Sequence, residues 1–318
     1  MLFNQKTAAF TADLEEKYKD CFHGLGKLKD FQLGLHVDSS VKPVAQPVRR
    51  IPFSVRKQVD DKLKQLEEMD VIERVSGPTP WVSPLVVVHG KKEPRLCVDM
   101  RRANEAIVRE RHPIPIIDEI LEDMTGATVF SKLDLKWGYH QIELKPESRS
   151  LTTFVSHTGL WRYKRLMFGI SSAPEIYQHI ISQVLQSIPG VHNISDDIIV
   201  SGETIQLHDE RLHQVLQRLQ ERQLTVNSKK CLFRMSQLEF MGHVLSKNGI
   251  GAAQSKIEAV ENTRRPTNAA EVRSFLGLVN YCGRFIPNLA TTSEPLRRLM
   301  RQPCKWTWGS EQEWHLWN

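Results

Sequence analysis

The stretch VHNISDDIIVSG, Val191 to Gly202, places two adjacent acids, Asp196 and Asp197, between two apolar runs. Two apolar runs of strand length around a short polar segment predict a β-hairpin. The simplest interpretation of the acids is a soluble turn, because Asp tolerates turn geometry. Whether these carboxylates also have a chemical role depends on the rest of the sequence.

A third acid, Asp134, stands at the end of the apolar strand Val129 to Leu133 in FSKLDLKWGYHQ. A strand-end carboxylate beside an acidic pair on a separate hairpin is an arrangement that holds two divalent metals, about 3.5–4 Å apart, for phosphoryl displacement. Mg²⁺ suits such a site because it takes few carboxylates and completes its shell with water and phosphate. Neither acid is specific alone, since a strand-end Asp is more often a helix cap or a salt-bridge partner.

The composition is that of a globular chain with a modest basic surplus. Lys and Arg number 43 against 37 for Asp and Glu, so the net charge is +6. This favours an anionic partner, although solubility alone explains so small a surplus. Five scattered cysteines without C-x-x-C spacing argue against a disulfide framework or a zinc site. No apolar run reaches the roughly 18 residues of a membrane helix, and no signal peptide is apparent, so we expect an intracellular chain without a membrane partner.

Helices are predicted where apolar residues recur every three or four positions, in residues 8–22, 54–69, 171–188, 207–222 and 269–286. Strands are predicted by β-branched or apolar runs: a hairpin with a basic tip over 81–100, single strands over 128–135 and 160–168, and two strands around a turn over 224–246. Beyond Gly249 the pattern predicts helices alone. Strands and helices without regular βαβ alternation indicate an α+β fold. His208 and His213, five residues apart on one predicted helix, do not share a face and are interpreted as solvated.

Seven motifs in order extend the interpretation from Tyr18 almost to the C-terminus: TPWVSPLVVV, LCVDMRRAN, FSKLDLKWGYHQI, RLMFGISSAP, ISDD, LEFMGHVLS and VRSFLGLVNYCGRFIP. Together they resemble the reverse transcriptase of gypsy-type LTR retrotransposons. The resemblance implies a right-hand polymerase fold of fingers, palm and thumb. Its expected parts are an N-terminal extension (1–45), fingers (46–127 and 148–168), palm (128–147 and 169–248, with the catalytic hairpin and primer grip) and thumb with the start of a connection segment (249–318).

The resemblance implies RNA-directed DNA polymerase activity, with deoxynucleotides added to a primer 3′-hydroxyl on an RNA or DNA template. Asp134 and Asp196 would then ligate two Mg²⁺ ions, for which Mn²⁺ can substitute, and Asp197 would be a weaker or indirect ligand. The partners would be a template-primer duplex and dNTPs. Protease, ribonuclease H and integrase would belong to a longer pol polyprotein, located in the cytoplasm, within virus-like particles, or in the nucleus.

Further site residues follow from the same resemblance. Tyr139 would be the aromatic gate that excludes a ribose 2′-hydroxyl, with a core tyrosine as the alternative. The other expected nucleotide-binding residues are Lys91, Lys92 and Arg95 at the fingers hairpin, Phe168 and Gly169, the pocket residue Gln178, and Lys229 or Lys230 near the pyrophosphate. For the lysines and Arg95, a solvated surface is the alternative.

The hairpin Phe240, Met241, Gly242 and His243 would grip the primer terminus, while Arg273 and Arg284 would contact the duplex backbone without reading its sequence. Gly169 is expected to have a positive φ or a close backbone neighbour.

Two departures from the resembled pattern stand out. Ile194 occupies the place of an aromatic, usually Tyr, two residues before the first paired acid, and no acids for a ribonuclease H site follow the thumb. A weakly active or inactive relic that only binds nucleic acid is therefore an alternative. A two-metal nuclease is a second, but it would leave Tyr139 and the primer-gripping hairpin without a task.

Overall fold

The computed structural model describes residues 2–88, 94–301 and 306–317. Contacts along the chain divide it into two compact units, Met1–Met235 (unit 1) and Ser236–Asn318 (unit 2). The strands with the expected primer grip fall in unit 2 by this division. The boundaries of fingers, palm and thumb stay predictions.

A four-stranded antiparallel sheet in unit 1 carries the three acids. Its strand order is β7 (Val191–Ile194), β8 (Asp197–Gly202), β4 (Val129–Asp134) and β9 (Leu232–Met235). β4 and β8 pair over their full lengths, up to the pair Asp134↔Asp197 at the strand end. Ile198, Ile199 and Val200 are fully buried. Since successive strand residues point to opposite faces, β8 is covered on both.

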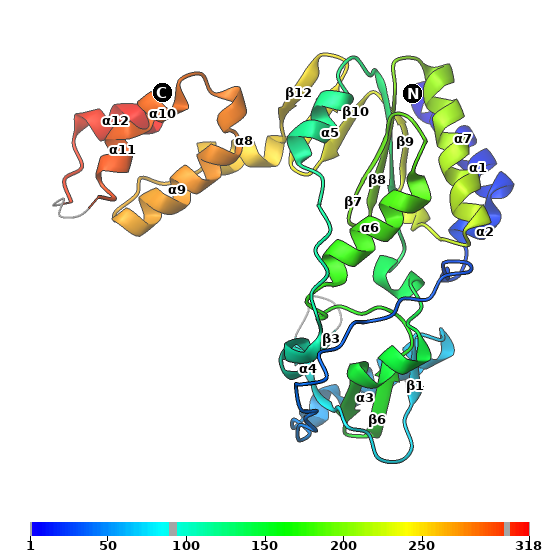
Figure 1. The fold of residues 1–318 in the computed structure, drawn as a ribbon. Helices are drawn as coiled ribbons and strands as arrows, with labels where there is room; N and C mark the ends of the chain where they lie inside the picture. The colour runs from blue at the N-terminus through cyan, green and yellow to red at the C-terminus, as the bar shows by residue number, and fades with distance from the viewer. Residues whose placement is uncertain (1, 89–93, 302–305, 318) are drawn as a thin grey trace. The chain divides into compact units, whose positions relative to one another are not determined.

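Two helices pack on this sheet and on each other, α6 (Ala173–Leu185) and α7 (Ile205–Glu221) (Figure 1). α6 begins with Pro174 in its first turn, where a missing N–H is harmless,. α7 begins at the N-cap Thr204, whose hydroxyl accepts a hydrogen bond from the Leu207 amide,. The apolar face predicted for α6 is buried, which fixes the rotation of the helix against the sheet.

A five-stranded sheet forms the other main part of unit 1. Its order is β1 (Ile72–Arg74), β6 (Gly159–Tyr163), β5 (Thr153–Ser156), β2 (Ser83–Val88) and β3 (Arg95–Val98). β2 and β3 are antiparallel, which confirms the predicted hairpin, while β2 and β5 are parallel. Helix α3 (Phe53–Glu68) packs against β1, and α4 (Arg101–Ala106) follows β3, whereas α5 (Ile117–Asp123) lies away from this sheet (Figure 1). The helix predicted from residue 54 is α3, and its apolar positions are buried.

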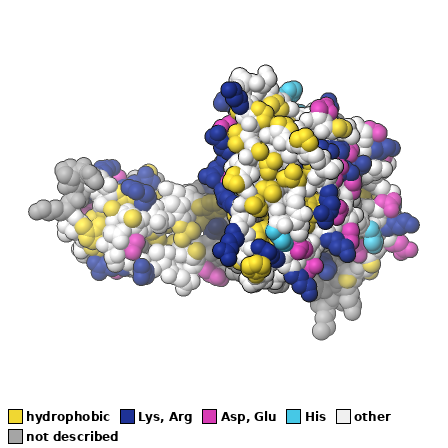
Figure 2. Space-filling view, turned by 90° about the horizontal axis from the view of Figure 1, so that it is seen from below, with side chains coloured by type: hydrophobic (Ala, Val, Ile, Leu, Met, Phe, Trp, Pro, Cys, Tyr) yellow, Lys and Arg dark blue, Asp and Glu magenta, His cyan; other side chains and the backbone are white. Residues whose placement is uncertain are grey.

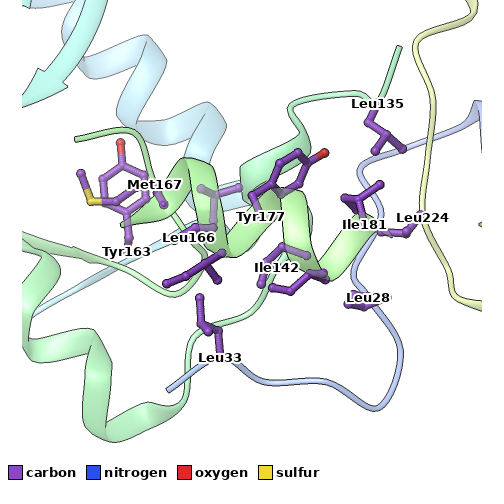
Figure 3. Packing of buried hydrophobic residues seen from close by; sticks show 14 of the residues in the cluster. Leu28, Leu33, Leu135, Ile142, Tyr163, Leu166, Met167, Tyr177, Ile181 and Leu224 are labelled. Carbon is purple, nitrogen blue, oxygen red and sulfur yellow. The ribbon is translucent and has the colours of Figure 1, made fainter. Parts of the chain in front are cut away.

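The N-terminal segment is part of the packed core. After α1 (Leu2–Lys17) and α2 (Lys19–Phe22), the chain forms isolated bridges through Leu33 to Leu144 and through Ala45 to Val82. Figure 3 shows Leu28 near Ile181 and Leu224 among buried apolar side chains. The described side chains between Leu14 and Leu33 therefore contribute to the core of unit 1.

Unit 2 combines a small sheet with helices. The antiparallel sheet has the order β10 (Gln237–Phe240), β11 (His243–Ser246) and β12 (Gly249–Ala252). The helices are α8 (Gln254–Glu261), α9 (Ala269–Tyr281), α10 (Leu289–Thr292), α11 (Glu294–Arg298) and α12 (Ser310–Trp317). Val272, Phe275 and Leu296 lie in a separate apolar cluster.

Four sequence predictions of secondary structure are wrong in part. LEFMGHVLS is not one strand but the hairpin β10–β11, because Met241 and Gly242 both have positive φ, +48° and +74°, and turn the chain. Residues from Gly249 form strand β12 before the helices begin. Of the strand predicted over 224–233, only Leu232 and Phe233 lie in a strand, β9.

The strand predicted over 160–168 ends at Tyr163. Its continuation leaves the sheet because Arg165, 4% exposed, turns inward and donates hydrogen bonds to the carbonyls of His140 and Gly26. The chain then reaches Phe168 in a loop instead of a strand.

His208 is buried rather than solvated. Its Nε2 lies 2.8 Å from the Ser131 hydroxyl and its Nδ1 2.9 Å from the Asp209 carboxylate. Arg234 donates two hydrogen bonds to the same carboxylate. Burial lowers the His208 pKa, so the ring is neutral and links α7 to β4 and β9.

Candidate active site

The three acids meet at one end of the four-stranded sheet. Ile194 pairs with Asp197, so Ser195 and Asp196 form a two-residue turn between β7 and β8. The Leu135 amide donates a 2.8 Å hydrogen bond to the Asp196 carbonyl. This bond ties the turn to the strand that ends at Asp134, and places carboxylates from two separate segments side by side.

The three carboxylates have different partners. Asp134 accepts hydrogen bonds of 3.0 and 3.2 Å from the Lys230 ammonium, whose side chain is 63% exposed. Asp197 lies 2.8 Å from the Lys132 ammonium. The buried Oδ1 of Asp196 has no hydrogen-bond partner in the described chain. Asp196 is thus the acid with the greatest need for a further positive ligand.

The surroundings of Asp196 disfavour its charge. Its pKa is raised, chiefly by burial, and the negative charges of Asp134 and Asp197 act in the same direction. The nearby Tyr177 hydroxyl and the Lys230 charge oppose this rise. A divalent cation between the carboxylates would stabilise the ionised form that the protein itself disfavours.

Gly138 makes room for this arrangement. A Cβ at this position would lie 2.0 Å from the Tyr177 hydroxyl oxygen and 2.2 Å from Asp196 Oδ1. Tyr177 is 1% exposed and is held within the apolar cluster of Figure 3. No side chain larger than hydrogen fits beside Asp196 unless this packing changes.

The donor set fits Mg²⁺ with two carboxylates rather than three. In the described part of the chain, no group of three or more His, Cys, Asp or Glu is arranged to hold a metal, and Asp197 is occupied by Lys132. Mg²⁺ needs only one or two protein carboxylates beside substrate phosphates and water. Asp134 and Asp196, the latter with its free buried oxygen, meet that need.

Tyr139 lies beside the acids in an aromatic group. Its ring centroid is 4.6 Å from that of Phe168 and 4.9 Å from that of Tyr177. Burial, with the nearby Asp196 and Glu175 charges, raises the Tyr139 pKa to about 12. Phe168 is 61% exposed. The structure therefore brings the expected gate residue and Phe168 together next to Asp196.

The loop after Phe168 is fixed from a neighbouring helix. Gly169 has φ +102°, and a Cβ there would lie 3.3 Å from the Val98 carbonyl oxygen, so both expectations for this glycine are confirmed. Asn104 of α4 donates to the Gly169 carbonyl and accepts from the Ser171 amide. These contacts set the course of the chain into α6.

Gln178 differs from its expected surroundings. Its side chain is 2% exposed, and its amide forms hydrogen bonds with Asn193, Ser182 and Ser195. The amide faces the back of the acidic hairpin instead of an open pocket. These hydrogen bonds do not favour a direct contact between Gln178 and a nucleotide, and that contact stays a prediction.

The expected basic residues are only partly placed. Lys91 and Lys92 lie outside the described residues. Arg95 begins β3 and is exposed. Of the two lysines in the 3₁₀ turn Ser228–Lys230, Lys230 reaches Asp134, whereas Lys229 is exposed and forms no ion pair with the acids in the described part of the chain.

The expected primer grip is a well-defined turn of unit 2. Phe240 is fully buried, and the His243 ring stacks on Tyr281 of α9 with centroids 5.5 Å apart. The Tyr281 hydroxyl donates a hydrogen bond to the Met241 carbonyl. Its role toward a primer stays a prediction.

Sequence reasoning missed Lys132, Gly138 and Tyr177. Strand alternation could have found Lys132, because residues two apart on β4 share a face with Asp134. Gly138 and Tyr177 carried no comparable signal, since their meeting with Asp196 depends on how α6 packs on the sheet.

Comparison with known proteins supplies the family. Residues 88–245 match the model of "Reverse transcriptase (RNA-dependent DNA polymerase)". The chain is 31% identical over 278 residues to an uncharacterized protein of Caenorhabditis elegans, covering 86% of this chain and 22% of that protein. It is 30% identical over 271 residues to the Tf2-3 transposon polyprotein of Schizosaccharomyces pombe, covering 84% of this chain and 20% of the polyprotein. The chain thus spans about a fifth of the length of these relatives.

Solved structures confirm the fold class. The foamy viral protease-reverse transcriptase in complex with dsDNA has a TM-score of 0.86 at 22% identity, over 98% of this chain and 66% of that one. A second foamy viral structure, with ds DNA, has a TM-score of 0.85 at 23% identity, over 96% and 55%. The α+β architecture is that of a right-hand polymerase. From the family match over residues 88–245 and the relatives at 30–31% identity, the chain belongs to the reverse transcriptase family.

Proposed function

We propose that this chain is the polymerase of a gypsy-type retroelement and adds deoxynucleotides to a primer 3′-hydroxyl on an RNA or DNA template. The observation that carries the proposal is the partnerless, buried Oδ1 of Asp196 beside Asp134, in a family of polymerases. Two Mg²⁺ ions, or Mn²⁺ in their place, would be held by these two acids. When bound, they supply positive charge that activates the primer hydroxyl and steadies the leaving pyrophosphate.

Other residues would present the metal ligands and hold the triphosphate. The side chain of Asp196, set in the turn, would present its free oxygen, and Lys132 would hold Asp197 to one side through their ion pair. Lys230 would leave Asp134 when the cations bind and would then be free to face the triphosphate. Arg95, with Lys91 and Lys92, would hold the triphosphate from the fingers hairpin.

Tyr139 would select the sugar. Its ring is packed against Phe168 and Tyr177, so it cannot move aside for a ribose 2′-hydroxyl. Replacing Tyr139 by Ala or Val should admit ribonucleotides, as measured by the ratio of kcat/KM for dNTP and rNTP. Unchanged sugar selectivity in the purified variants would contradict this role.

The nucleic acid would lie against basic and apolar surface. Figure 2 looks onto one face of the molecule and shows apolar side chains bordered by Lys and Arg. In unit 2, Arg273 and Arg284 are exposed. Binding through phosphate contacts should weaken steeply as salt rises.

Primer extension on an RNA template with Mg²⁺ and dNTPs tests the proposal. Wild type should extend the primer, while Asp134→Asn and Asp196→Asn should not. Asp61→Asn, which removes a carboxylate exposed on α3, is the matched control and should extend normally. A wild-type chain that binds the duplex without extending it would favour the relic, and cleavage of the template without dNTPs would favour a nuclease.

A further inference from the structure

The inference concerns the side chain behind the acidic turn. Gln178 lies on α6 and is 2% exposed. Its Oε1 accepts a 2.8 Å hydrogen bond from the Ser195 amide, and its Nε2 donates a 2.8 Å bond to the Asn193 carbonyl. One amide therefore joins the end of β7 to the first residue of the turn.

The Gln178 amide is itself held by further hydrogen bonds through Ser182. Gln178 Nε2 also donates to the Ser182 hydroxyl, one helical turn further along α6. That hydroxyl donates a 3.0 Å bond to Asn193 Oδ1. The Gln178 side chain thus has its carbonyl and its amide groups engaged, and a buried network satisfied in this way has one low-energy arrangement.

The turn needs such support. Ser195 has φ +53°, in the left-handed region, which is strained for a residue with a Cβ,. Gln178 holds the peptide between Ile194 and Ser195, and the Leu135 amide holds the peptide between Asp196 and Asp197. The two-residue segment Ser195–Asp196 is therefore fixed at both of its ends, which restricts the direction of the Asp196 side chain.

We propose that Gln178 is a positioning residue: it holds the Ser195–Asp196 turn in its left-handed form, so that Asp196 faces Asp134 and the two acids bind divalent cations together. This rests on the proposed function of the two acids. Gln178 touches neither nucleotide nor metal in this role and acts only through the backbone of the turn.

The test is Mn²⁺ binding by the full chain, followed by electron paramagnetic resonance in the absence of nucleotide. Gln178→Met keeps the size of the side chain and removes its hydrogen bonds. Mn²⁺ affinity should fall by about 10-fold to 100-fold, as when other residues that orient metal ligands are changed. Gln183→Met, the same change on the exposed side of α6, should leave the affinity unchanged.

A rescue separates positioning from general packing. Gly adopts the left-handed region without strain, so adding Ser195→Gly to Gln178→Met should restore part of the lost affinity. If Gln178→Met does not fold by circular dichroism, the double variant is compared with Ser195→Gly alone, and a loss in affinity smaller than 10-fold to 100-fold is expected because the glycine needs less support. Affinity equal to that of Gln183→Met, or a loss that Ser195→Gly does not reduce, would overturn the inference.

The outcome also separates this inference from the proposed function. Wild type that binds Mn²⁺ and extends primers, with Gln178→Met equal to it, overturns the role of Gln178 alone. Wild type that binds no Mn²⁺ and extends no primer overturns both.

Discussion

The Ser195–Asp196 turn of unit 1 and the Met241–Gly242 turn of unit 2 each join two antiparallel strands and each contain left-handed residues. Each is also hydrogen-bonded by the side chain of a helix, Gln178 of α6 in one case and Tyr281 of α9 in the other. The two turns are built on the same plan.

They differ in how firmly they are held. Gln178 is buried and engaged on both sides of its amide, whereas Tyr281 is 40% exposed and its hydroxyl donates one bond to the Met241 carbonyl. A side chain in a closely packed core has no alternative conformation available, whereas an exposed side chain can rotate into solvent. A turn that carries the proposed catalytic carboxylate would require fixed geometry, while a turn with the proposed role of following a moving primer would not.

The largest effect is expected for Gly138→Ala. The new methyl group would meet the Tyr177 hydroxyl and Asp196 Oδ1, and the buried Tyr177 cannot withdraw. Overpacking of this kind destabilises by about 1–3 kcal/mol, and displacement of Asp196 should lower primer extension about 100-fold. Steady-state kinetics and urea unfolding measure the two effects. Gly277→Ala, whose Cβ has open space around it, is the control; full activity of Gly138→Ala would contradict the tight fit.

Acid should weaken unit 1 more than unit 2. Burial lowers the His140 pKa to about 4, so below pH 6.5 the unfolded chain binds a proton that the folded chain does not,. This stability is present above pH 6.5 and is lost as the pH falls toward 4, by about 2 kcal/mol between pH 7 and pH 5. The pKa values of His192 and His208, also in unit 1, are lowered too.

Hydrogen exchange resolved along the chain at pH 7 and pH 5 measures this difference, after correction for the intrinsic exchange rate. Protection in β4 and α6 should fall more than protection in α9. An equal loss in both units would contradict the assignment of the acid sensitivity to the buried histidines of unit 1, His140, His192 and His208.

The smallest effect is expected for Gly242→Ala. Its φ of +74° disfavours a Cβ by about 1–2 kcal/mol, and the methyl group would meet the Tyr281 hydroxyl, 2.3 Å away. Because Tyr281 is exposed it can move, so the contact itself should add little. Thermal unfolding measures the loss of stability in Gly242→Ala. Adding Tyr281→Phe to this variant should change that loss only slightly. A loss larger than that of Gly138→Ala would reverse the comparison of the two turns.

Much of this architecture could be predicted from the sequence, because local patterns determine it. The apolar spacing of α3 and α6 and the β-branched hairpin β2–β3 each carry their own signal. The two acids at strand ends were found in the same way. The resemblance carried by the seven motifs then indicated the right-hand polymerase fold.

What could not be predicted depends on contacts between distant segments. The apolar pattern of LEFMGHVLS conceals its turn, which requires a left-handed Met241, and only the resemblance implied a hairpin at this place. The burial of His208 depends on Ser131 and Asp209, and the Gln178 amide on the turn 17 residues away. Residue types alone do not say which buried polar groups will find each other.

The central claim is that Asp134 and Asp196 together bind divalent cations. The most direct measurement is anomalous scattering from Mn²⁺ in crystals of the chain with a primer-template and an incoming dNTP. Density between these two carboxylates, with Asp197 still against Lys132, is the expected result. Manganese bound elsewhere, with Asp134 and Asp196 both without a metal contact, would contradict the account.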